Sequence, residues 1–410
     1  MKSTPEKTCI VVGASHAAAQ FVVSLRQGGW DGRIIMIGDE MELPYHRPPL
    51  SKDFLSGDKS HDDILLRPAS VYEKAEVELK LGVRVEAIDR DSRTVTTDSG
   101  EVIAYSKLVL ATGARVRQLP VPGADLDNVF YLRDATDVRA IKVSVAPGKS
   151  AVIIGGGYIG LETAASLRKQ GMDVTVLEAM PRILQRVTAP DLSMFYKRVH
   201  TEEGVEILES VAASEIQETD SGLKVLTGGD TNLDADMVII GIGVIPNSEL
   251  AEQAGLQVSN GIEVDEFACT DDPDIYAIGD VTWHYNPIYD RHIRLESVPN
   301  ATEQAKTAAL AINGNPKPYN SLPWFWSDQF DLKLQIAGLS QGHDSVVIRG
   351  DITGSRSFAA FYFEGDRLLA VDAVNRPREF MMTRQVLTRG QTLDKAIINN
   401  DGADLKSAIV

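Results

Sequence analysis

Three glycines at a fixed spacing are the first residues of this sequence whose pattern could do chemistry. Gly155, Gly157 and Gly160 form the pattern Gly-x-Gly-x-x-Gly between an apolar run, 151–154, and a helical pattern that extends to Lys169. Glycines in this arrangement permit a tight turn, a close approach of the backbone to a pyrophosphate, and close packing of helix on strand. The 155–160 loop therefore predicts a dinucleotide site.

An acidic residue completes this pattern. Glu178 ends the next predicted strand, 18 residues after Gly160 (178 − 160 = 18). A carboxylate at this place hydrogen-bonds ribose hydroxyls and repels a 2′-phosphate, so we predict NADH rather than NADPH as the nucleotide. Arg182 and Arg186 follow closely and could weaken that preference.

A degenerate copy of the same pattern lies near the N-terminus. An apolar run, 9–12, leads into Gly13, and Ser15 and Ala18 stand at the positions of the second and third glycines. A serine hydroxyl can still donate to a phosphate, and alanine still permits fairly close packing of helix on strand. Asp39 ends the next predicted strand. We expect a second nucleotide site at this 13–18 loop, with a structural turn as the alternative.

Two further apolar strands are predicted to end in glycine turns, at Thr112-Gly113 and at Gly279-Asp280. Open parallel sheets bind their ligands at the carboxyl ends of the strands. Asp280 is therefore a candidate acceptor for the hydroxyl chain of a flavin, and a turn or helix-cap aspartate is the alternative.

Size and composition limit the possible classes of protein. The 410 residues suggest two or three domains, and the net charge of −17 disfavours nucleic acid or an anionic membrane as a general partner. Two cysteines cannot hold a ferredoxin-type cluster, and they do not form a Cys-x-x-Cys pair. The sequence assigns no metal ligands, and we expect a cytoplasmic protein without membrane spans.

The pattern changes after Leu322. Alternating strands are predicted around 334–338, 346–349, 358–363 and 368–371, followed by a helix near 377–387. This pattern predicts an α+β domain. We expect the polar tail from Asn399 onward to fray.

Six motifs in this order resemble the flavin-dependent NADH:ferredoxin reductases of bacterial oxygenase systems, the family of putidaredoxin reductase and biphenyl dioxygenase reductase. The motifs are Pro48-Pro-Leu-Ser-Lys52, Ala111-Thr-Gly113, Gly155-Gly-Gly-Tyr-Ile-Gly-Leu-Glu162, Gly279-Asp280, Glu296-Ser-Val-Pro-Asn-Ala301 and Pro323-Trp-Phe-Trp-Ser-Asp328. The main departure is Ser15, where the family commonly has glycine.

The resemblance implies a glutathione-reductase-like α/β fold, with two Rossmann-type dinucleotide-binding domains and a C-terminal α+β domain. The implied boundaries are 1–113 and 244–321 for the two segments of an FAD domain, 114–243 for an NAD domain, and 322–410 for the C-terminal domain. It also implies non-covalent FAD, NADH as electron donor, and a [2Fe-2S] ferredoxin as partner, which supplies a cytochrome P450 or a Rieske oxygenase.

Site residues follow from the motifs. The resemblance and the strand ends together place twelve residues around FAD: Gly13, Ser15, Ala17, Asp39, Lys52, Val85, Thr112, Gly113, Arg133, Gly279, Asp280 and Val298. Six residues fall around NAD: Gly155, Gly157, Ile159, Gly160, Glu178 and Gly243.

Three residues are candidates for roles in electron transfer. By resemblance, the ammonium of Lys52 lies beside the reacting edge of the flavin, and Glu162 could pair with it across a domain interface and contact the nicotinamide amide. A purely structural salt bridge is the alternative. Trp326, two residues from Trp324 and so on the same face of an extended segment, could cover the flavin, or it could be packing.

Other flavoproteins remain as alternatives. An NADH-dependent reductase of a small acceptor, similar to monodehydroascorbate reductase or an oxidase, would share these motifs, and so would a flavin-bound NADH sensor similar to apoptosis-inducing factor. A disulfide reductase is disfavoured because the segment 48–52 has no cysteine. An acidic ferredoxin would need local positive charge, for which the candidates are Arg67, Lys306, Lys333 and Arg376.

Overall fold

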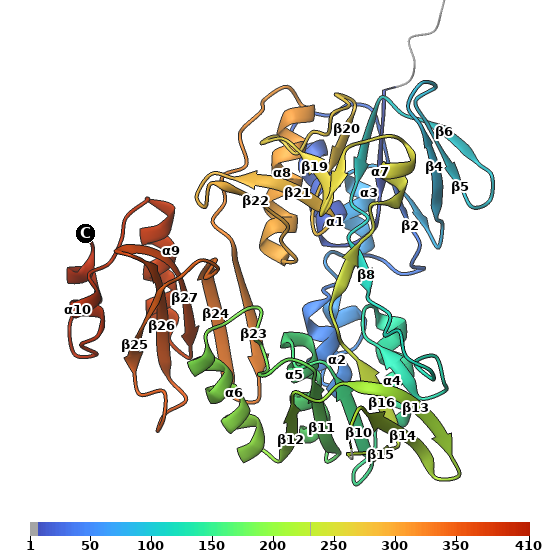
Figure 1. Ribbon diagram of the computed structural model, residues 1–410. Helices are drawn as coiled ribbons and strands as arrows, with labels where there is room; N and C mark the ends of the chain where they lie inside the picture. Colours follow the sequence, from blue (N-terminus) through green and yellow to red (C-terminus); the bar gives the residue numbers. More distant parts are fainter. Residues whose placement is uncertain (1–6, 230) are drawn as a thin grey trace, which may run out of the picture. The chain divides into compact units, whose positions relative to one another are not determined.

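The computed structural model describes residues 7–229 and 231–410, and the chain divides into two compact units. Unit 1 comprises Met1–His46, Asp62–Arg115 and Ile245–Pro323. Unit 2 comprises Arg47–His61, Val116–Val244 and Trp324–Val410. Figure 1 shows the elements in their order along the chain.

Unit 1 is built on a parallel sheet of five strands in the order β20-β7-β1-β2-β3. Its helices and strands, with the strands at which the chain passes to unit 2, are β1 (Thr8–Val12), α1 (His16–Gln27), β2 (Arg33–Gly38), η2 (Asp62–Ile64), α3 (Ala69–Lys74), β3 (Val77–Leu81), β4 (Val85–Asp89), β5 (Thr94–Thr97), β6 (Val102–Ala104), β7 (Lys107–Leu110), β8 (Ala114–Val116), β17 (Val244–Pro246), α7 (Glu249–Gln253), β18 (Val258–Ser259), β19 (Gly261–Val264), β20 (Ile275–Ala277), β21 (Thr282–Asn286), β22 (Arg291–Ile293) and α8 (Val298–Ile312).

Alternation along β1 explains the layers of unit 1. Cys9 and Val11 belong to an apolar core shared with the alanine-rich helices α1 and α8, whereas Ile10 and Val12 belong to a second core shared with the antiparallel sheet β4-β5-β6. Because successive side chains of a strand point to opposite faces, a continuous apolar run is buried on both sides. This arrangement confirms the parallel sheet predicted for the N-terminal repeat.

Unit 2 contains a second parallel sheet, in the order β12-β11-β10-β16-β9, and a C-terminal antiparallel sheet, in the order β23-β24-β27-β26-β25. Its elements are η1 (Pro48–Ser51), α2 (Asp53–Ser56), β9 (Val129–Tyr131), α4 (Ala135–Ser144), β10 (Ser150–Ile154), α5 (Tyr158–Lys169), β11 (Asp173–Glu178), α6 (Pro190–Glu202), β12 (Val205–Glu209), β13 (Ala213–Thr219), β14 (Gly222–Thr227), β15 (Leu233–Ala235), β16 (Met237–Ile240), β23 (Trp324–Gln329), β24 (Leu332–Gly338), β25 (Ser345–Gly350), β26 (Phe358–Glu364), β27 (Arg367–Val374), α9 (Pro377–Thr388), α10 (Lys395–Ile398) and η3 (Leu405–Ala408).

The C-terminal strands and the helix α9 confirm the predicted α+β region, but the expectation of a frayed tail is wrong. The buried guanidinium of Arg349 donates to the carbonyl oxygens of Ile398, Asn400, Asp401 and Ala403 at 2.7–3.2 Å. One buried cation thus organises the turns of the tail, a long-range interaction that local composition does not reveal.

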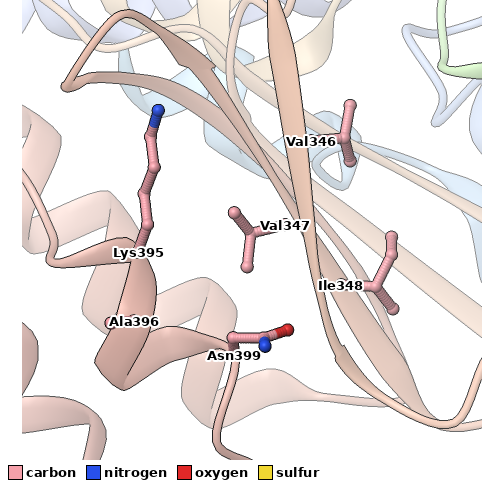
Figure 2. A pocket seen from close by; sticks show the side chains of 6 residues that line it. All are labelled: Val346, Val347, Ile348, Lys395, Ala396 and Asn399. Atoms are coloured by element: carbon pink, nitrogen blue, oxygen red, sulfur yellow. The ribbon is translucent and has the colours of Figure 1, made fainter.

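A cavity of about 500 Å³ lies between β25 and α10 (Figure 2). It is lined by Val346, Val347, Ile348, Lys395, Ala396 and Asn399. None of these residues belongs to the predicted cofactor sites. Among the described residues, no helix is long and apolar enough to cross a membrane.

Candidate functional site

The 155–160 loop joins β10 to α5 at the carboxyl end of the parallel sheet of unit 2. Gly155 has φ +118°, and an added Cβ there would lie 2.3 Å from the carbonyl oxygen of Gly241. A Cβ on Gly160 would lie 2.1 Å from the carbonyl oxygen of Gly155, whereas one on Gly157 would face open space. The loop therefore leaves room at the N-terminus of α5, where backbone N–H groups bind phosphate. The residues fit a pyrophosphate.

Glu178 lies beside this loop at the end of β11. Its carboxylate accepts hydrogen bonds from the backbone N–H of Gly156 at 2.8 Å and of Met180 at 2.7 Å. These bonds fix the carboxylate next to the glycine turn, as an acceptor for ribose hydroxyls requires. Arg182, which could have favoured a 2′-phosphate, instead donates to Ser193 Oγ at 2.6 Å and to the Gln185 carbonyl oxygen at 3.1 Å.

The other two residues predicted around NAD lie in the same part of unit 2. Ile159, in the first turn of α5, is 48% exposed, which is unusual for isoleucine and leaves an apolar surface beside the loop. Gly243 has φ +101° in the turn after β16, and its carbonyl oxygen accepts from the Arg117 N–H at 2.9 Å. Both positions remain predicted contacts.

Lys52 and Glu162 form an ion pair within unit 2, with Nζ 2.7 Å from Oε2. Glu162 is only 3% exposed, and the Lys52 side chain is 15% exposed. Two hydroxyl groups complete the coordination of the carboxylate: Ser51 donates to Oε2 at 2.5 Å and Ser327 to Oε1 at 2.6 Å. The predicted pair is formed, but within one compact unit and not across a domain interface as expected, because the segment 47–61 belongs to unit 2. The two serines are partners that sequence reasoning missed.

Local structure explains why Lys52 reaches this carboxylate. Pro48 and Pro49 begin the short helix η1, and the Lys52 N–H donates back to the Pro49 carbonyl oxygen at 3.0 Å. Ser166, one turn after Glu162 on α5, donates to the Ser51 carbonyl oxygen at 2.6 Å. The helix α5 therefore holds the segment 48–52 at two successive turns.

Unit 1 carries most residues predicted around FAD. Gly13 has φ +116°, and a Cβ there would lie 2.2 Å from the carbonyl oxygen of Ala111, so only glycine fits between β1 and the end of β7. Ser15 is the N-cap residue of α1, and Ala17 lies in its first turn. The 13–18 loop thus has the strand, tight turn and helix that a second dinucleotide requires.

The turn at Thr112 and Gly113 is held by a residue that sequence reasoning missed. The side-chain amide of Asn247 donates to the Thr112 carbonyl oxygen at 2.9 Å, and the backbone N–H of Asn247 donates to the Gly113 carbonyl oxygen at 2.9 Å. Thr112 Oγ1 donates in return to the Asn247 carbonyl oxygen at 2.7 Å. No local pattern signals this role, because 135 residues separate the partners.

A second missed residue, Gln304, organises the turn at Gly279 and Asp280. Its Oε1 accepts from the Gly279 N–H at 2.8 Å and from Thr282 Oγ1 at 3.0 Å, and it is buried on α8. Val298 begins the same helix. Gln304 therefore links two of the segments that the sequence places around the flavin.

The remaining predicted flavin residues lie in different surroundings. Asp39 is exposed after β2 and pairs with Arg84 at 3.2 Å. The Val85 side chain is buried in the apolar core, so only its backbone can contact a cofactor. Lys52 and Arg133 belong to unit 2, where the Arg133 carbonyl oxygen accepts from Arg47 at 2.8 Å.

Trp326 lies on β23 beside Trp324, with ring centroids 5.7 Å apart, so the two indoles share a face as predicted. Because side chains alternate along a strand, this face is opposite to the one that carries Ser327. Trp326 is therefore not part of the hydrogen-bonded group around Glu162. Its flavin contact remains a prediction.

Both cysteines are free thiols. Burial in β1 raises the pKa of Cys9 well above its usual value, and burial raises the pKa of Cys269 to about 11. Neither thiol is ionised at neutral pH, so neither is an activated nucleophile.

Comparison with known proteins places this geometry in a family. Residues 7–305 match the pyridine nucleotide-disulphide oxidoreductase family, and residues 324–409 match the reductase C-terminal domain. The chain belongs to the pyridine nucleotide-disulphide oxidoreductases. This membership confirms the predicted glutathione-reductase-like fold class.

Several relatives of this chain are ferredoxin reductases that match almost from end to end. Putidaredoxin reductase of Pseudomonas putida is 41% identical over 406 residues, covering 98% of this chain and 96% of the relative. The ferredoxin–NAD(+) reductase component of the anthranilate 1,2-dioxygenase system of Burkholderia cepacia is 39% identical over 97% of this chain and 98% of its own.

A solved structure gives the same result. Putidaredoxin reductase in its covalent complex with putidaredoxin aligns with a TM-score of 0.95 at 40% identity, covering 98% of each chain. Sequence and structure together identify this chain as an FAD- and NADH-using ferredoxin reductase, in agreement with the NADH predicted from Glu178 and the FAD implied by the resemblance.

Proposed function

We propose that this protein oxidises NADH and passes the electrons through FAD to a small [2Fe-2S] ferredoxin, which supplies a cytochrome P450 or a Rieske oxygenase. The observation that carries the proposal is the buried ion pair of Lys52 and Glu162, held on the helix that begins at the 155–160 loop. Two relatives support the acceptor, because one is seen joined to putidaredoxin and the other serves a dioxygenase system.

Bound FAD would supply hydride acceptance and the release of single electrons, so the part of this chain's own residues is to bind and orient. The 155–160 loop receives the pyrophosphate of NADH, and Glu178 receives the ribose hydroxyls. Lys52 and Glu162 order the end of the site where the nicotinamide reacts. Neither residue needs to transfer a proton to the substrate, because hydride transfer between two rings requires none.

The cytoplasm is the proposed location, since the nucleotide donor and the ferredoxin are both available there. Cell fractionation followed by immunoblotting tests it: the proposal requires recovery with the cytoplasmic fraction, and recovery with periplasmic proteins refutes it.

The decisive experiment is the reduction of a purified [2Fe-2S] ferredoxin by the flavin-loaded protein, with NADH, NADPH and dioxygen compared. We expect fast reduction with NADH, slower reduction with NADPH, and slow turnover when dioxygen is the only acceptor. Reduction of the flavin without reduction of the ferredoxin would refute the proposed acceptor. It would favour a reductase of a small acceptor when turnover continues, or an NADH sensor when turnover stops.

A further inference from the structure

One face of β23 lies against α5. This face carries Phe325, Ser327 and Gln329, which alternate with the residues of the tryptophan face. The rings of Phe325 and Tyr158 have centroids 5.2 Å apart, and Ser327 Oγ donates to Glu162 at 2.6 Å. Tyr158 and Glu162 are four residues apart and so share one side of the helix. The C-terminal sheet therefore supplies a direct partner to the carboxylate.

The carboxylate of Glu162 accepts two hydrogen bonds, forms one ion pair and is almost fully buried. Ser51 donates to Oε2 and Ser327 donates to Oε1, and Lys52 Nζ lies 2.7 Å from Oε2. Two donors and a cation stabilise a negative charge that burial would otherwise penalise. They also fix the plane of the carboxylate, because each oxygen has a defined partner.

A second row of hydrogen bonds lies behind Ser327. Gln329 Nε2 donates to Ser327 Oγ at 3.1 Å, and Gln329 Oε1 lies 2.8 Å from His200 Nε2. Ser327, Gln329 and His200 are all buried. Burial lowers the pKa of His200 to about 4, so its ring is neutral at neutral pH. Because the amide oxygen can only accept, the hydrogen of the neutral ring must be on Nε2.

These hydrogen bonds have one direction. His200 donates to Gln329, Gln329 donates to Ser327, and Ser327 donates to Glu162. If Ser327 donated back to Gln329, it would meet an N–H group and leave one oxygen of Glu162 without this donor. The amide at position 329 therefore determines which way the Ser327 hydroxyl points.

We propose that Ser327 and Gln329 are positioning residues for hydride transfer. The hydrogen bonds from His200 through Gln329 and Ser327 hold the Glu162 carboxylate oriented toward Lys52, beside the place where the nicotinamide of NADH reacts. This inference rests on the proposed function, since it presumes that Glu162 orders the nicotinamide. It extends the site to a residue of the C-terminal domain, Gln329, that reaches the carboxylate only through Ser327.

The test replaces the amide by a group of the same shape and opposite hydrogen-bonding character. In Gln329→Glu the new carboxylate accepts from both neighbours, so it draws the Ser327 hydroxyl away from Glu162. We expect the rate of flavin reduction at saturating NADH, measured by stopped flow, to fall about 10-fold, the effect of one lost hydrogen bond to a charged group. The NADH dissociation constant should change less than about 3-fold, because the nucleotide loop is untouched.

Gln385→Glu is the matched control. It makes the same substitution on α9 of the same domain, where the side chain is exposed, and should leave the rate unchanged. A pair of variants at Ser327 gives an independent measurement: Ser327→Ala should slow flavin reduction, and Ser327→Thr, which keeps the hydroxyl, should recover most of the rate. This pair decides the question if Gln329→Glu does not fold with its flavin.

The variant Glu162→Gln distinguishes a failure of the proposed function from a failure of the positioning role of Ser327 and Gln329. If Glu162→Gln leaves flavin reduction unchanged, the role given to this pair in the proposed function is wrong. If Glu162→Gln slows the reaction but Gln329→Glu and Ser327→Ala behave as the wild type, the proposed function stands and the positioning role is refuted. Equal slowing by Ser327→Ala and Ser327→Thr would also refute it.

Discussion

Replacement of Lys52 by methionine removes the cation from the most deeply buried charge of the candidate site. At 2.7 Å and an effective dielectric constant near 20, the attraction between Lys52 and Glu162 is about 6 kcal/mol, most of which offsets the transfer of both groups from water. Loss of one partner of a buried pair costs about 3–5 kcal/mol. Because Ser51 and Ser327 still donate to the carboxylate, we expect Lys52→Met to lower the free energy of unfolding by about 3 kcal/mol.

The matched substitution Glu162→Gln leaves an ammonium that is 15% exposed and still donates to the Pro48 carbonyl oxygen at 3.2 Å, so its cost should be about 2 kcal/mol. The double variant buries no unpaired charge. Its cost should also be about 2 kcal/mol, well below the sum of the single costs.

The wild type, the two single variants and the double variant form a double-mutant cycle. Urea unfolding of these four flavin-loaded proteins measures the coupling energy between Lys52 and Glu162, and stopped-flow reduction by NADH measures the rate of hydride transfer in each. A coupling energy below about 0.5 kcal/mol would refute the description of the pair as buried and interacting. Lys52→Met should also slow hydride transfer or shift the flavin reduction potential. If both are unchanged while the coupling is large, the pair is a structural salt bridge only.

Four further outcomes follow from the structure. Burial raises the pKa of Asp372 to about 6 from 3.8, so the folded protein holds this proton more tightly than the unfolded chain and loses stability as the pH rises from about 4 to about 6. Asp372→Asn keeps an oxygen for Tyr362 and Thr188 and should stabilise the protein by up to about 3 kcal/mol at pH 8 but little at pH 4, measured as urea midpoints; an equal effect at both pH values contradicts this. Glu178→Ala should raise the KM for NADH about 10-fold with little gain for NADPH, because Arg182 stays bound to Ser193 and Gln185; a large gain with NADPH would show that Arg182 is free to move. Lys333→Glu should raise the KM for ferredoxin more than Lys306→Glu does, since Lys306 is already paired with Glu303 at 2.7 Å; equal effects would contradict docking by uncompensated charge. The rate of ferredoxin reduction should fall as salt is added, and a rate independent of salt would refute steering by charge altogether.

The sequence predicted those parts of the site that depend on local backbone geometry. The glycines at 13, 155 and 160 were recognisable because a Cβ at each would collide with a backbone oxygen, and no other residue type fits. Glu178 was recognisable because a βαβ unit of fixed length places the end of the second strand beside the first turn. The contacts of Gly160 with Gly155 and of Glu178 with Gly156 lie within one βαβ unit, so spacing alone identifies them. Gly13 and Gly155 instead approach Ala111 and Gly241 at the end of a neighbouring strand, and it was their place in the glycine pattern that marked them.

The residues that the sequence did not reveal act across long separations. Ser327 meets Glu162 over 165 residues, and Asn247 meets Thr112 over 135. Serine, asparagine and glutamine are common polar residues whose type carries no signal until a fold brings them to a buried partner. The sequence indicated only that Glu162 could pair with Lys52. The structure shows that this carboxylate is buried, and a buried carboxylate has to be satisfied by donors besides its ion-pair partner. The docking of β23 on α5 brings the Ser327 donor to it, and that is where the site of this reductase extends beyond its dinucleotide loops.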